Sequence, residues 1–165
     1  MKIDLHSHSF YSDGVLSPSE VVKLASQARC DLFSLTDHDT TDGIAEAQVE
    51  ADKLNLNLLH GVEISAFWRN MAIHILGLGI DINNDILQTG LEHNQKLRKE
   101  RAEKIALSLW RSGIKDALEK TQSFSKTDML TRTHFAQMLI SEGYCKDMKA
   151  VFRRYLTGKK PGGVS

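Results

Sequence analysis

The sequence has few cysteines and no long apolar stretch, and each absence excludes a class of protein. Its two cysteines, Cys30 and Cys145, lie far apart with no second thiol near either, so a disulfide framework or a zinc ribbon has no support. No apolar run approaches the length of a membrane span or of a signal-peptide core. At 165 residues and 41% apolar content, we expect a cytoplasmic protein that buries its own core and does not contact a membrane.

The net charge of zero conceals two halves of opposite charge. Residues 1–95 hold five Lys/Arg and fourteen Asp/Glu, a net charge of −9, whereas residues 96–165 hold sixteen and seven, a net charge of +9. An acidic half that also carries histidines is suited to cations, and a basic half is suited to phosphates or nucleic acid. A basic helical segment is as often a simple solvated face, so charge alone leaves both interpretations open.

The first 80 residues alternate between strands and helices. Apolar and polar residues alternate from Ile3 to His8, which predicts a strand with one apolar and one polar face. The segment Ser17-Pro18-Ser19-Glu20 has the form of a capping box and predicts the start of a helix. The expected order is β-α-β-α-β-β, with strands at about 3–8, 32–35, 56–64 and 72–78 and helices at about 17–29 and 42–54.

The remainder of the chain has a helical pattern. Charged residues with loosely periodic apolar positions predict a long helix over 85–111, ended by Gly113, and shorter helices are expected over 128–142 and 147–155. We therefore expect an α/β protein, either a parallel barrel or an open sheet, interrupted by a helical insertion. The expected parts are the first α/β segment at 1–84, the helical insertion or lid at 85–157, and a linker at 158–165.

Each predicted strand brings side chains able to bind a metal, either within the strand or directly after it. Two histidines at i and i+2 are a weak signal by themselves, but each later strand adds another imidazole or carboxylate. The carboxyl ends of parallel strands meet at one edge of an α/β sheet, so these groups are expected to converge there. The candidate metal ligands are His6, His8, Asp13, His38, Glu63 and His74.

The mixture of imidazole and carboxylate indicates which ions such a site would take. It suits manganese, iron or zinc better than calcium, and a carboxylate such as that of Glu63 can bridge two ions. Two or three divalent ions lower the pKa of a shared water and hold the oxygens of a phosphate, so no side-chain nucleophile is required. No serine or cysteine nucleophile motif is present.

Other polar residues near these positions have simpler interpretations. Asp37 and Asp39 flank His38, and we favour a supporting hydrogen bond or a helix cap over direct metal ligation for both. His60 has the opposite strand parity to Glu63, so it is expected to point away from the site.

Five separated motifs occur in order along the chain: Asp4-Leu5-His6-Ser7-His8, Ser12-Asp13-Gly14, Leu35-Thr36-Asp37-His38-Asp39, Gly61-Val62-Glu63-Ile64-Ser65 and His74. In order and spacing they resemble the PHP (polymerase and histidinol phosphatase) family. In the insertion, Arg132-Thr133-His134-Phe135 and residues 151–156 resemble a bacterial branch that includes a 5′-to-3′ exoribonuclease and a nucleoside 3′,5′-bisphosphate phosphatase. This resemblance covers essentially the whole chain.

This resemblance implies a fold, a metal site and a reaction. The fold would be part of a distorted seven-stranded β/α barrel holding two or three divalent ions, with manganese favoured. The implied ion sets are His6, His8 and Glu63; Glu63 and His74; and Asp13 and His38. Arg132 and His134 would contact the substrate phosphate, although a surface arginine and a packed histidine are the simpler alternatives. Weaker candidates for steering an anionic substrate are Arg98, Arg101, Lys159 and Lys160.

The chain departs from the family pattern in one respect. The family takes further ligands from a later His-Pro and a later Asp-x-His, and this chain has no histidine after His134. We therefore expect an N-terminal fragment that, isolated, binds metal weakly and is nearly inactive.

The expected function is hydrolysis of phosphate esters in nucleotides or at RNA 5′ ends by metal-activated water. The substrate would be a nucleotide or a 5′-phosphorylated RNA oligonucleotide. One alternative is a phosphatase for a small metabolite such as histidinol phosphate. Another is a non-catalytic PHP scaffold, although such a scaffold would have no need of the six candidate ligands. The sequence leaves the oligomeric state open.

Overall fold

The computed structural model describes residues 1–69 and 71–164, which divide into two units. Unit 1 spans Met1–Gln95 and unit 2 spans Lys96–Ser165. The long helix α3 (Asp85–Arg111) contributes its first eleven residues to unit 1 and the rest to unit 2. The division expected after residue 84 falls at the start of this helix, eleven residues before the boundary between the units, and the expected parts stay a prediction.

A small parallel sheet lies at the start of unit 1. It consists of β1 (Ile3–Asp4), β2 (Leu32–Phe33) and β3 (Asn57–Leu58), in the order β1-β2-β3. The first two strands are shorter than expected because side chains interrupt the backbone ladder. The Ser7 amide donates to the Thr36 hydroxyl at 3.2 Å, and that hydroxyl donates back to the Ser7 carbonyl. The extended chain continues beyond the ladder, but side chains as well as backbone groups hold it.

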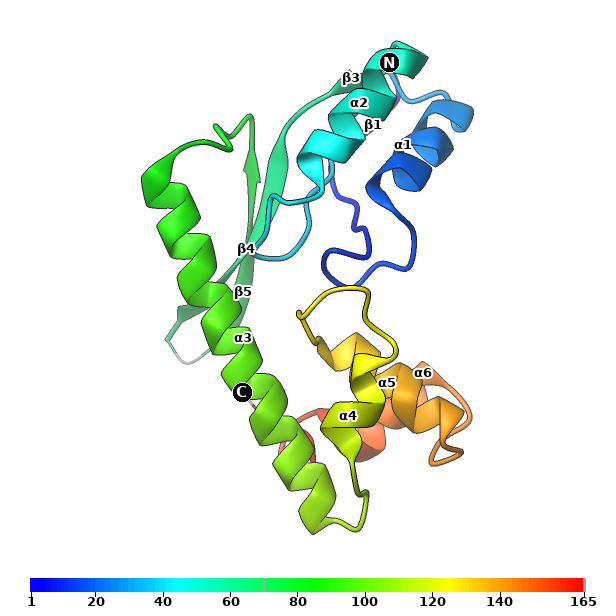
Figure 1. Ribbon diagram of the computed structural model, residues 1–165, viewed down its shortest axis with the longest axis vertical. Helices are drawn as coiled ribbons and strands as arrows, with labels where there is room; N and C mark the ends of the chain where they lie inside the picture. The colour runs from blue at the N-terminus through cyan, green and yellow to red at the C-terminus, as the bar shows by residue number, and fades with distance from the viewer. Residues whose placement is uncertain (70, 165) are drawn as a thin grey trace. The chain divides into compact units, whose positions relative to one another are not determined.

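Two helices pack against one another in unit 1 and supply part of its apolar core (Figure 1). Helix α1 (Pro18–Gln27) begins as expected, because Ser17 and Glu20 form both hydrogen bonds of a capping box. Helix α2 (Ile44–Leu54) ends at Asn55, which adopts a left-handed conformation. The buried cluster consists of Val22, Ala25, Phe33, Leu35, Ala47, Ala51 and Leu56.

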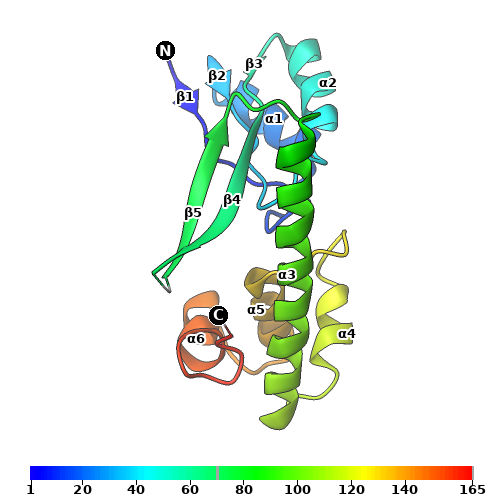
Figure 2. The same ribbon diagram turned by 90° about the vertical axis from the view of Figure 1, so that its left-hand side faces the viewer.

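A two-stranded antiparallel hairpin completes the strands of unit 1 (Figure 2). It pairs β4 (Gly61–Trp68) with β5 (Met71–Leu78). The expectation of one strand over residues 56–64 is wrong, because the chain changes sheets at His60. The Leu59 amide still bonds to Phe33 of the parallel sheet, whereas the His60 carbonyl accepts from Gly79 after β5.

Gly61 is required at this change of sheets. A Cβ atom there would lie 2.4 Å from the Ser34 hydroxyl and 2.7 Å from a methyl carbon of Thr36, which is too close for any side chain. The observed order is therefore β-α-β-α-β-β-β. Among the described residues the strands form two separate sheets and not a closed barrel, so the structure confirms the α/β class alone.

The helices of unit 2 agree with expectation in part. Helix α3 has the predicted bounds, and Gly113 follows it with a positive φ of 90°. Helix α5 (Arg132–Ser141) is shorter than expected, and the expected helix at 147–155 is divided into α6 (Met148–Val151) and the π-helix η1 (Phe152–Leu156). Helix α4 (Ala117–Gln122) was not predicted; Asp116 before it is left-handed and makes no side-chain cap.

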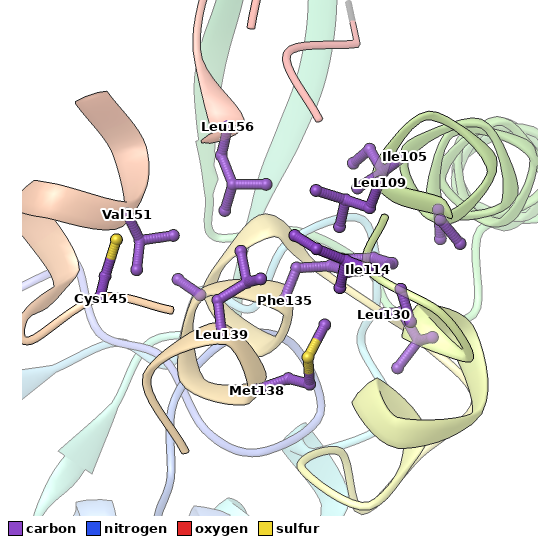
Figure 3. Packing of buried hydrophobic residues seen from close by; sticks show 14 residues of the cluster. Ile105, Leu109, Ile114, Leu130, Phe135, Met138, Leu139, Cys145, Val151 and Leu156 are labelled. Carbon is purple, nitrogen blue, oxygen red and sulfur yellow. The ribbon is translucent and has the colours of Figure 1, made fainter. Parts of the chain in front are cut away.

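Unit 2 is built around a continuous apolar core. Phe135 and Leu139 of α5 lie in one cluster with Ile105 and Leu109 of α3 (Figure 3), and Leu156 of η1 belongs to the same cluster. The segment expected to be a linker folds back as turns: the amide of Gly162 donates to Tyr155 at 2.6 Å. No helix in the described part of the chain has the length and apolar character needed to cross a membrane.

Candidate metal centre

Unit 1 brings all six candidate ligands into one cluster. Two of them follow β1, one lies in the next loop, one follows β2, and the hairpin strands carry the last two. His38 and Glu63 are paired directly by an isolated parallel bridge, which places the chain after β2 beside β4. His74 is paired with Ser65, two residues from Glu63, so both side chains lie on the same face of the hairpin.

Glu63 lies at the centre of the cluster and is only 6% exposed. Its Oε2 is 2.7 Å from Nε2 of His6, 3.1 Å from Nε2 of His8 and 3.6 Å from Nδ1 of His38. Its Oε1 is 2.6 Å from Nδ1 of His74. Both oxygens of one carboxylate therefore face imidazoles from different elements, which is the arrangement expected of a carboxylate that bridges two cations.

The cluster contains three sets of donor atoms, and within each set all the donor atoms lie within 4.8 Å of one another. Ligand atoms about 2.1 Å from a shared ion lie within roughly 4.2 Å of each other, so small adjustments would let each set hold a divalent cation. These residues therefore fit the metal ions implied by the family. The sets are His6, His8 and Glu63; His8, Asp13 and His38; and His38, Glu63 and His74.

The electrostatics of Glu63 favour its charged form. Burial raises the pKa of this carboxyl, but hydrogen bonds from His6 and His74 and the charges of His38 and His8 outweigh burial and lower it. The net result is a pKa below the usual range of glutamate, which keeps the central ligand ionised. The His6 and His74 side chains remain 53% and 41% exposed, so the cluster is open to solvent on their side.

Asp37 holds the loop that carries Asp13. Its carboxylate accepts from the amide and hydroxyl of Ser9 at 2.7 and 2.6 Å and from the Ser12 hydroxyl at 2.6 Å. Burial raises the pKa of Asp37 above its usual value, although these hydrogen bonds and the charge of His8 oppose the shift. The observed contacts give Asp37 a supporting role, in agreement with the preference for support over ligation.

The loop itself is tightly packed against His8. Nδ1 of His8 lies 3.7 Å from the Asp13 carboxylate and 3.3 Å from the Ser12 hydroxyl. Gly14 closes the loop at a point where a Cβ atom would lie 2.4 Å from the His8 carbonyl oxygen. The loop conformation thus depends on a glycine at this position.

The remaining polar positions lie outside the cluster. Nε2 of His60 lies 3.0 Å from the side-chain oxygen of Gln48 on α2, which is a structural contact. In unit 2, Thr131 and His134 form a reciprocal cap at the start of α5, and His134 is only 2% exposed. This arrangement favours the packed alternative for His134. Arg132 is partly exposed in the first turn of the same helix, and the phosphate role of both residues stays a prediction.

Several residues that support the site were not predicted from the sequence. Ser9 and Ser12 bind Asp37, and Asn94 and Gln95 of α3 bind Asp39 through their side-chain amides. Ser12 lies inside one of the resembling motifs and could have been found there, whereas Ser9 directly follows the first motif and lies in none of them. The two amides lie more than 50 residues from Asp39 in a charged helix, where no local pattern distinguishes them.

The family model of the PHP domain matches residues 4–157. The chain belongs to the PHP domain family. A 3′,5′-nucleoside bisphosphate phosphatase of Chromobacterium violaceum is 44% identical over 164 residues, covering 99% of this PHP chain and 58% of the relative. The 5′-3′ exoribonuclease Rnm of Escherichia coli is 42% identical over 163 residues, covering 98% of this PHP chain and 56% of the relative.

A solved structure supports the same assignment. It is an amidohydrolase from Chromobacterium violaceum with bound sulfate, with a TM-score of 0.96 and 43% identity to this PHP chain. It is matched over 100% of this chain and 58% of its own. The PHP chain thus spans a little over half the length of the relatives it matches.

Proposed function

We propose that this chain is part of a metal-dependent phosphoesterase that hydrolyses phosphate esters of nucleotides or of RNA 5′ ends. The single observation that carries the proposal is the position of Glu63, whose two carboxylate oxygens face imidazoles from three separate segments. The similarity to a nucleoside bisphosphate phosphatase and to a 5′-3′ exoribonuclease supports this class of substrate.

We assign the metal ions to the three donor sets centred on Glu63, His8 and His38. Manganese is the proposed ion, with iron and zinc as alternatives, because the donors combine imidazole nitrogen with carboxylate oxygen. Bound divalent ions lower the pKa of water and neutralise charge on a phosphate. With three protein donors in each set, and residues shared between sets, we expect the 165-residue chain alone to bind metal weakly and to turn over little substrate.

The residues of the chain have separate tasks in this scheme. Glu63 stays ionised and orients the imidazoles around it, whereas Asp37 holds the loop that presents Asp13. Unit 2, with its net charge of +9, attracts anionic substrates, and Arg132 is the proposed phosphate contact. His134 is a weaker candidate because its ring is buried.

The direct test uses the full-length protein. Elemental analysis should find divalent metal, and the protein should release phosphate from adenosine 3′,5′-bisphosphate or shorten a 5′-phosphorylated RNA oligonucleotide. Activity toward only one of these substrates would identify the branch. Turnover of histidinol phosphate alone would support the small-metabolite alternative instead.

Two variants separate the enzyme from a non-catalytic scaffold. His8→Ala and Asp13→Ala should abolish hydrolysis while the free energy of unfolding measured without metal changes little. If both variants retain wild-type metal content and turnover, the proposed site is wrong. If the wild-type protein holds metal but hydrolyses none of the three substrates, the scaffold interpretation is supported.

A further inference from the structure

Asp39, the residue after His38, connects the candidate metal centre to helix α3. It is fully buried and has a positive φ of 53°, a left-handed conformation that is uncommon outside glycine. Its amide donates to the Glu63 carbonyl at 2.9 Å, and its carboxylate accepts from the Ser65 amide at 2.7 Å. The residue therefore binds β4 on both sides of Ile64 and holds the turn that presents His38.

Asn94 of α3 holds this turn from the other side. Its side-chain Nδ2 donates to the Asp39 carboxylate at 2.8 Å and to the Ser65 carbonyl at 2.9 Å. Both acceptors lack a proton to donate, so the orientation of the amide is determined by its partners. The neighbouring Gln95 adds a bond from its Nε2 to the Asp39 carbonyl at 2.9 Å.

The contact is close to the ligands in sequence and lies in unit 1. Asp39 follows one candidate ligand by one residue, and Ser65 follows another by two. A single amide therefore joins the two segments whose ligands, His38 and Glu63, belong to the same donor set. The contact therefore spans the segments of two candidate ligands and not the side chain of one.

We propose that Asn94 is a positioning residue for the metal centre, acting through Asp39 and Ser65 to keep His38 and Glu63 at the separation that a cation requires. This inference rests on the proposed function, because it assigns Asn94 a role in metal binding. A contact that served stability alone would affect the free energy of unfolding and leave metal affinity unchanged in the folded protein.

Gln88 provides a matched control on the same helix. Its Nε2 donates to the Thr41 hydroxyl at 3.0 Å and to the Ile82 carbonyl at 2.6 Å. Like Asn94, it uses one amide to join α3 to the segment after β2 and to a backbone carbonyl. Unlike Asn94, it contacts neither β4 nor a residue adjacent to a candidate ligand.

The experiment compares Asn94→Leu with Gln88→Leu in the full-length protein. Isothermal titration with Mn²⁺ gives the dissociation constant, and urea unfolding without metal gives the stability of the same preparations. Supporting groups around metal ligands typically contribute about 10–100-fold in affinity, so Asn94→Leu should weaken Mn²⁺ binding by that factor. Gln88→Leu should change the dissociation constant by clearly less than the roughly tenfold lower end of that range, because Gln88 contacts no residue next to a candidate ligand.

A second variant covers the case in which Asn94→Leu does not fold. Asn94→Ser keeps one donor in a smaller side chain and should give an intermediate loss of affinity. Mn²⁺ binding within threefold of wild type in the folded Asn94 variants would overturn the inference while leaving the proposed function intact. Absence of Mn²⁺ binding in the wild-type protein would overturn both.

Discussion

The two units differ in what they bury. Unit 1 encloses carboxylates and hydroxyls, among them Asp37, Asp39 and Glu63, beside a modest apolar cluster. Unit 2 encloses a larger apolar cluster drawn from α3, α5 and η1, and few of its buried side chains are polar. Burying charged groups is costly unless they are bonded, so the polar interior of unit 1 is expected where chemistry requires it. Stability and metal binding should therefore respond to substitutions in different units.

The largest effect on stability is expected in the core of unit 2. Phe135→Ala removes a fully buried ring and should lower the free energy of unfolding by about 3–5 kcal/mol, measured by urea denaturation. Phe124→Ala, at a ring that is 36% exposed, should cost about 1 kcal/mol or less. Mn²⁺ affinity of the folded Phe135→Ala protein should match wild type. A roughly tenfold loss of Mn²⁺ affinity would show that stability and metal binding do not respond to substitutions in different units.

In unit 1, Glu63→Gln should weaken metal binding, the property that Phe135→Ala is expected to leave unchanged. Replacing the central carboxylate removes a charge shared by two donor sets, so Mn²⁺ affinity should fall more than about 100-fold in calorimetric titration. Glu50→Gln is the matched control, because Glu50 is also buried in unit 1 but pairs with Lys23 and Lys53. Equal affinities in the two variants would refute the central role of Glu63.

A smaller effect is expected at the start of α1. Ser17→Ala removes the side-chain cap and should lower the free energy of unfolding by about 1 kcal/mol without changing Mn²⁺ affinity. Ser26→Ala, in the last turn of the same helix, should leave stability unchanged or slightly raised, because alanine is the better helix former. A similar loss in both variants would mean that the capping box contributes little.

The smallest effect is a pH dependence at Glu50. The hydrogen bond from Lys53 lowers the pKa of this carboxyl below its usual 4.5, with the charges of Lys23 and Lys53 adding to it against burial. A carboxyl whose pKa is lowered in the folded state stabilises the protein at pH values above its unfolded-state pKa. This stabilisation is lost as the pH falls through the folded-state pKa. The stability difference between wild type and Glu50→Gln should therefore shrink below about pH 4.5 in urea unfolding. A difference that does not vary with pH would show that the ion pairs contribute nothing.

Local signals in the sequence predicted the helices better than the sheets. The capping box at Ser17 and the glycine after α3 act within a few residues, so both ends were predicted correctly. The break at His60 depends on pairing with Gly79 beyond the hairpin, which no local pattern contains. Helix α4 has six residues and no side-chain cap, so it gave no signal at all.

In the candidate site, too, local sequence signals predicted some features, and contacts between distant residues determine the others. The candidate ligand positions were inferred because each predicted strand brings one within it or after it and because five motifs resemble one family, and their role as ligands stays a prediction. The distance between Glu63 and His74 depends on the hairpin register that pairs His74 with Ser65. The distances from Glu63 to the three other histidines depend on how segments far apart in the sequence pack together. The amide of Asn94 could not be predicted, because its role depends on a contact 55 residues away.

The outer edge of β5 has a practical consequence for work on the isolated chain. This eight-residue strand pairs with β4 on one side, and on the other it meets no strand of the described residues. Met71, Ile73 and Ile75 are exposed along it. Such an edge is a template for intermolecular β-pairing. Light scattering of concentrated samples should detect aggregates, and a lysine in place of Ile75 should delay their appearance.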